Sequence, residues 1–77
     1  MNKRQDITSA NIRAELARRG MTQAELAATF DPPYVPGAIS RRLAGVVPWR
    51  VGEIQHVAKT LDVPIEVLWP TPRQTAS

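Results

Sequence analysis

The stretch RGMTQAELAATFDPPYVPGAISRRLAG, residues 19–45, decides the fold of this chain. Near its start, Thr22 and Glu25 have the spacing of a capping box, in which each side chain accepts a hydrogen bond from the backbone N–H of the other residue. A capping box marks the beginning of a helix, and we expect this helix to run from Thr22 to Phe30. The prolines at positions 32 and 33 then end it in a rigid turn, because proline cannot continue a helix.

Pro36 opens the next predicted helix, since the N–H that proline lacks would have no partner at the first helical position. This helix runs to Ala44, and Gly45 is well placed to close it. Ile39 and Leu43 lie four residues apart, so they share the face that packs into the core. Two short helices joined by a tight turn have the arrangement of a helix-turn-helix.

Three more helices are predicted around this pair, because apolar residues recur there at helical spacing. They cover Thr8–Arg19, Trp49–Leu61 and a short segment that begins at Pro64 and ends before Pro70. No segment alternates apolar and polar residues long enough to suggest a strand, so we expect an all-α fold, a compact five-helix domain over residues 8–69. Residues 1–7 are expected to form an N-terminal arm and residues 70–77 a flexible C-terminal tail.

Length and composition restrict the classes of function. The chain has 77 residues, enough for one small domain, and its lack of cysteine with only one histidine, His56, argues against a metal site. We therefore expect no enzyme, no catalytic residue, no cofactor, no metal and no small-molecule ligand. Without a run of roughly 20 apolar residues, a membrane span is not expected and a cytoplasmic location is. The net charge of +3 weakly favours an anionic partner.

Three segments of the sequence resemble the lambda-repressor-like family of helix-turn-helix regulators, also called the xenobiotic-response-element type, which includes phage Cro and repressor proteins. They are RGMTQAELA at 19–27, ISRRLAG at 39–45 and the segment from Ile54 through Val63-Pro64. The resemblance covers residues 8–69, although the turn from Phe30 to Tyr34 is longer than the family's usual turn. It implies sequence-specific binding to a double-stranded DNA operator by a transcriptional regulator in a bacterial cell or a phage-infected host.

In that family, the second helix of the pair lies in the major groove and the start of the first helix meets the phosphate backbone. Arg41 is then expected to read guanine O6 and N7, Ser40 to reach a base edge or a phosphate, and Arg42 to pack its stem and turn its guanidinium toward phosphate. The full set of matching positions is Thr22, Gln23, Val35, Pro36, Gly37, Ala38, Ser40, Arg41, Arg42 and Arg50. Gln23 and Arg50 are the expected phosphate contacts, and the alternative for Gln23 is a solvent-exposed helix former.

Other assignments stay open at this stage. A dimer would bring two recognition helices to half-sites ~34 Å apart, and we expect a homodimer contact at Ile65, Leu68 and Trp69. Lys3 and Arg4 are candidates for a DNA-binding arm, with an ordinary solvated terminus as the alternative. Two other functions remain: an antitoxin that binds DNA to regulate its own synthesis, and a protein-interaction module on the same fold without DNA binding.

Overall fold

The computed structural model describes residues 3–70, which form five α-helices and no strand. The helices are α1 (Lys3–Arg19), α2 (Gln23–Ala28), α3 (Pro36–Leu43), α4 (Val51–Leu61) and α5 (Ile65–Leu68). The predicted all-α class and the predicted number of helices are therefore confirmed over this part of the chain.

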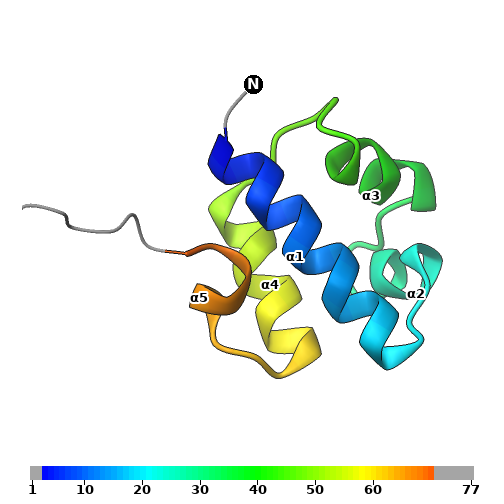
Figure 1. Ribbon diagram of the computed structural model, residues 1–77. Coiled ribbons are helices and arrows are strands. Elements are labelled where there is room, and N and C mark those ends of the chain that lie inside the picture. The colour runs from blue at the N-terminus through cyan, green and yellow to red at the C-terminus, as the bar shows by residue number, and fades with distance from the viewer. Residues whose placement is uncertain (1–2, 71–77) are drawn as a thin grey trace, which may run out of the picture.

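Helix α1 runs across the molecule, with the α2–α3 pair on one side of it and the α4–α5 pair on the other (Figure 1). It packs against α3 and α5, while α2 packs against α3 and α4 against α5. One apolar core joins all five helices, and its fully buried members include Ile12, Leu26, Ile39, Ile54 and Leu68. Ile39 and Leu43 face this core from α3, as their spacing predicts.

The start of α2 follows the local signals in the sequence. Thr22 is its N-cap, and both hydrogen bonds of the predicted capping box are present, from Glu25 N to Thr22 Oγ1 and from Thr22 N to Glu25 Oε1. Pro36 is the first residue of α3, also as predicted. After α3, Gly45 takes a left-handed conformation (φ 82°), which glycine adopts without steric cost and which turns the chain toward α4.

Helix α1 begins at Lys3, five residues before its expected start at Thr8. The amide of Gln5 explains the difference, because its nitrogen donates to Trp49 O (3.0 Å) and its oxygen accepts from Trp49 N (2.6 Å). The Arg4 guanidinium also lies over the Trp69 ring, 4.0 Å from its centroid. Residues 3–7 are thus part of the folded domain, and the expectation of an N-terminal arm was wrong for them. Residues 71–77, within the expected tail, lie outside the described residues.

Leu68 corrects the expected dimer contact. Its side chain is completely buried within the chain, whereas Ile65 and Trp69 are half-buried against the same core. The small domain does bury this leucine, because α5 folds back onto both α1 and α4. Leu68 therefore has no surface to offer to a second molecule.

Candidate nucleic-acid interface

The outer face of α3 carries most of the residues expected to meet DNA. With Ile39 and Leu43 turned inward, the helical period leaves Ser40 and Arg41 exposed on the opposite side and half-exposes Gly37. The other expected positions near its start are exposed Val35 and Pro36 and half-buried Ala38. The sequence-based assignment of faces on this helix therefore agrees with the structure.

The side chain of Arg41 lies back along the first turn of α3. A Cβ atom at Gly37 would sit 3.4 Å from Arg41 Nη1, so the guanidinium rests where any larger residue would press on it. No hydrogen bond or ion pair within residues 3–70 uses this guanidinium. Arg41 thus presents its five N–H donors on the outer face of the helix, in the fork geometry that matches two acceptors of one guanine.

Arg42 points the other way. Its Nε and Nη2 donate to the carboxylate of Glu53 at 3.1 and 3.0 Å, and its Nη1 donates to Ala38 O at 2.8 Å. Only 14% of its side chain is exposed. The stem packs as expected, but the guanidinium faces α4, where its donors are already bonded, and is not turned toward phosphate as expected.

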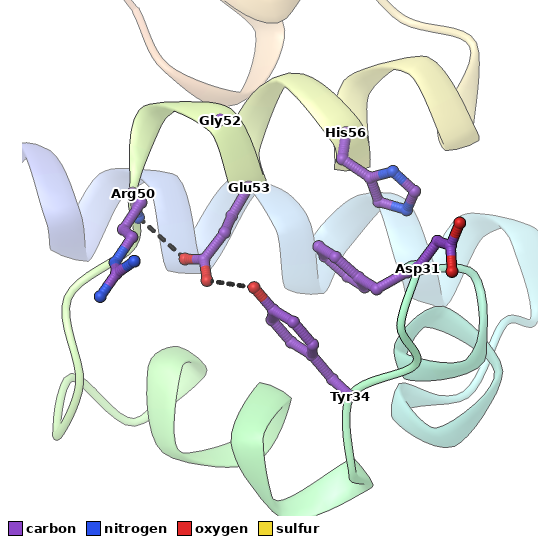
Figure 2. Close-up of a pocket in the computed structure, with 7 residues that line it drawn as sticks. Asp31, Tyr34, Arg50, Gly52, Glu53 and His56 are labelled. Carbon is purple, nitrogen blue, oxygen red and sulfur yellow. Dashed lines mark hydrogen bonds between the residues drawn. The ribbon is translucent and has the colours of Figure 1, made fainter.

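Glu53 accepts hydrogen bonds from three separate segments. Figure 2 draws those from Tyr34 and from the Arg50 backbone. Besides the two from Arg42 of α3, Glu53 accepts one from the hydroxyl of Tyr34 in the α2–α3 turn (2.6 Å) and one from the backbone N–H of Arg50, the N-cap of α4 (2.9 Å). Its residue is 6% exposed, and every strong acceptor direction of the carboxylate is in use. We call Tyr34, Arg42, Glu53 and the Arg50 N–H the Glu53 network.

The contacts within the Glu53 network shift the pKa values of the Glu53 carboxyl and the Tyr34 hydroxyl. Burial would raise the pKa of the Glu53 carboxyl, but the hydrogen bonds from Arg42, Tyr34 and the Arg50 N–H outweigh burial and lower that pKa below its ordinary value. The hydrogen bond that the Tyr34 hydroxyl donates to Glu53, together with burial, raises the pKa of that hydroxyl. Both shifts keep a charged carboxylate and a neutral phenol side by side near neutral pH.

The C-terminal end of α3 is held by α1. Ser9 Oγ donates to Arg42 O at 3.1 Å, and Arg13 Nη2 donates to Leu43 O at 2.7 Å. Carbonyls at the end of a helix lack the usual N–H partner four residues on, and here Arg42 O also accepts from the Gly45 N–H at 3.2 Å. A cation at this end opposes the negative end of the helix dipole. Ser9 in turn accepts a hydrogen bond from buried Trp49 Nε1 (3.1 Å), so the serine is fixed on both sides.

The remaining expected contacts lie at two helix starts. Thr22 and Gln23 are exposed at the beginning of α2, where unpaired N–H groups favour an anion. Thr22 uses its hydroxyl to cap the helix, which leaves the Gln23 amide as the side chain that can reach outward. Arg50 is exposed at the N-cap of α4, and only its backbone belongs to the Glu53 network.

A cavity of about 430 Å³ lies between the α2–α3 turn and the start of α4 (Figure 2). Its lining includes Tyr34, Arg50 and Glu53, together with Phe30, Asp31, Gly52 and His56. His56 stacks at a tilt on Phe30, with 4.1 Å between ring centroids, and its Nε2 lies 2.8 Å from Thr29 Oγ1. Within residues 3–70 no group of His, Asp and Glu side chains has the arrangement of a metal site.

Tyr34 and Glu53 are functional candidates that the sequence did not reveal. The only available signal was that Glu53 stands three residues after Arg50, at the position where a capping glutamate turns back to the N-cap. Nothing in the spacing indicated that Tyr34 and Arg42 would meet the same carboxylate, because those contacts join positions 11 and 19 residues apart.

Comparison with known proteins is consistent with this surface. Residues 6–74 match a family model described as winged helix-turn-helix DNA-binding. No curated protein and no solved structure gave a match. The described part of the chain contains no strand, and a loop from Ala44 to Arg50 joins α3 to α4. None of the helices there is long and apolar enough to cross a bilayer. With most of its length matched, the chain belongs to the winged helix-turn-helix DNA-binding family.

Proposed function

We propose that the chain binds double-stranded DNA in a sequence-specific manner and acts as a transcriptional regulator of the lambda-repressor-like type, as phage Cro and repressor proteins do. The observation that carries this proposal is the contrast between two neighbouring arginines. The Arg42 guanidinium is hydrogen-bonded to Glu53 inside the domain. Arg41 is exposed on the outer face of α3, and its guanidinium is unbonded within residues 3–70. An arginine with that freedom on a recognition helix has the chemistry for bidentate readout of guanine.

In this proposal, α3 enters the major groove and its flanks meet the backbone. Gln23 at the start of α2 and Arg50 at the N-cap of α4 contact phosphates, which position the domain without reading sequence. Ser40, beside Arg41 on the exposed side of α3, contacts a base edge or a phosphate. Val35, exposed by 63%, and Ala38 are placed to meet thymine methyl groups, and Pro36 with Gly37 leaves the start of α3 without bulk for a close approach.

Selection of binding sites from a random DNA pool, followed by affinity measurements on the selected site, tests this function. We expect affinity to fall steeply with salt, because Lys and Arg displace counterions from phosphates. Arg41→Ala should cost about 1–3 kcal/mol and relax the preference at one base pair, while Gln23→Ala should weaken all sequences alike. An unchanged site preference in Arg41→Ala would contradict the assigned readout.

A protein-interaction module without DNA binding is the second candidate, and the exposed Val35 and Val46 at either end of α3 favour it. Apolar side chains there suit a protein surface as well as a groove. This reading predicts binding to a protein partner that changes little with salt and ignores Arg41→Ala. The selection experiment separates the two functions, since a module of this kind enriches no DNA sequence.

We also propose that the protein acts as a homodimer on DNA. With Leu68 inside the core, the contact would use the sides of α5 that remain accessible, where Val67 is 39% exposed and Ile65 and Trp69 are half-buried. Two copies would match the symmetry of a palindromic operator. Sedimentation of the free and DNA-bound protein tests this: a monomer in both states would contradict it.

A further inference from the structure

Two sets of side chains link α3 and the turn before it to α4: the stack of Phe30 with Tyr34 and His56, and the Glu53 network. Helix α3 packs mainly on α1 and α2, and an open cavity of about 430 Å³ separates the α2–α3 turn from the first turn of α4. Helices α3 and α4 share the apolar core on their inner sides, while the aromatic stack crosses the gap only to the turn and not to α3 itself. The Glu53 network crosses it, since Figure 2 shows the Glu53 side chain reaching from α4 toward Tyr34 and the Arg50 backbone.

The two ends of this bridge carry the two kinds of DNA contact in the proposed function. Arg42, which donates two hydrogen bonds to Glu53, is the direct neighbour of Arg41 on α3, so this contact ties the turn of the helix that carries Arg41 to α4. Arg50, whose N–H also binds Glu53, supplies the phosphate contact at the start of α4. A base contact and a phosphate contact form together only when the distance between them fits the DNA, and small displacements are costly.

We propose that Glu53 is a positioning residue for DNA recognition: through Arg42, Tyr34 and the Arg50 N–H it sets the separation of α3 and the α4 N-cap, so that Arg41 and Arg50 engage the same site simultaneously. This inference rests on the proposed function and adds to it a specificity determinant that touches no DNA. The longer turn between α2 and α3 has a part in it, because that turn supplies Tyr34. The Tyr34 ring is held in place by stacking on Phe30, at 4.1 Å between centroids.

The chain offers a matched control for Glu53. Glu15 is also a buried carboxylate paired with two cations, Arg18 and Arg19, but it lies on α1 and its partners are on the same helix. Glu15→Gln therefore removes a comparable ion pair without touching the link between α3 and α4. A loss of DNA selectivity that came only from weaker folding would be similar in Glu15→Gln and Glu53→Gln.

The experiment measures the selectivity ratio, which is the affinity for the selected site divided by the affinity for a random duplex, in folded protein checked by circular dichroism. Glu53→Gln should lower this ratio about tenfold and Tyr34→Phe about fivefold, because each removes a hydrogen bond of the charged carboxylate. Affinity for random duplex should not fall in either variant, since Arg41 and Arg50 keep their charges and Glu53→Gln, like Glu15→Gln, removes a negative one. Glu15→Gln should leave the ratio unchanged.

Tyr34→Phe combined with Arg41→Ala provides the readout that a purely structural role would not move. If Tyr34 acts by placing Arg41, the loss of selectivity from Tyr34→Phe disappears once Arg41 is alanine; two additive losses would overturn the inference. Tyr34→Phe removes only a hydroxyl, so it also tests the positioning role if Glu53→Gln does not fold. Equal ratios in wild type, Glu53→Gln and Tyr34→Phe would overturn it too, while the absence of any selected site for wild type would overturn the proposed function itself.

Discussion

At the scale of single residues, Arg41 and Arg42 have the same side chain but different surroundings, because helical geometry points them in different directions. Successive side chains on a helix point about 100° apart, so Arg41 faces outward from α3 when Arg42 faces α4. Arg42 points toward the buried carboxylate of Glu53 and donates hydrogen bonds to it. Arg41 meets no such group within residues 3–70, and its donors stay unbonded there.

The lowered pKa of Glu53 predicts a specific dependence of stability on pH. Since the folded chain holds this carboxyl below its ordinary pKa of 4.5, its ionised form stabilises the fold at higher pH, and that contribution is lost as pH falls through and below this value. The difference in melting temperature between wild type and Glu53→Gln should therefore shrink between about pH 6 and pH 3. Gln55→Ala, an exposed and non-titrating change on the same helix, is the control. A gap for Glu53→Gln that stays constant over this range would contradict the prediction.

At the scale of elements, local signals were sufficient where a helix begins by its own chemistry. The capping box of Thr22 and Glu25 located α2, and Pro36 located α3 to the residue. The start of α1 was missed for the opposite reason. Thr8 and Ser9 are good capping residues, but both are buried inside the helix, and the hydroxyl of Ser9 binds a carbonyl of α3 instead. Contacts between positions far apart in the chain decided that boundary, and no local pattern contains them.

The same distinction applies to the candidate site. The exposed face of α3 followed from the spacing of Ile39 and Leu43, since periodicity alone tells which side is outside. The inward position of Arg42 did not follow, because its partner lies on another helix and a charged residue on an amphipathic helix is usually solvated. Tyr34 was hidden for a similar reason: it stands in a turn, where no period indicates a direction.

The contacts of Gln5 with the Trp49 backbone are expected to hold the first turns of α1 in place. Gln5→Ala removes both amide contacts to the Trp49 backbone, and each is worth about 1 kcal/mol. We expect the first turns of α1 to fray, with faster amide exchange near Thr8 and Ser9 and a lower melting temperature. Lys3→Ala, at an exposed position of the same segment, is the control and should exchange like wild type. Equal protection in the two variants would mean that Trp49 does not anchor this end.

At the scale of the whole molecule, α5 closes the core of a very small domain. A chain of this length has a total stability of roughly 4–12 kcal/mol, at about 0.05–0.15 kcal/mol per residue. One buried leucine is a large part of that, because truncation to alanine removes apolar contacts and leaves a cavity. The short helix is therefore as important to folding as the longer ones.

Leu68→Ala should accordingly lower the free energy of unfolding by about 2–5 kcal/mol, a large share of the total stability. Because Leu68 is buried within a single chain, this loss should not depend on protein concentration, as chemical denaturation at two concentrations would measure. Val67→Ala, on the exposed side of α5, should change the stability of the monomer by less than about 1 kcal/mol and instead weaken any dimer. If Leu68→Ala cost little in dilute solution but dissociated a dimer at high concentration, Leu68 would belong to an interface between molecules instead of to the core of one chain.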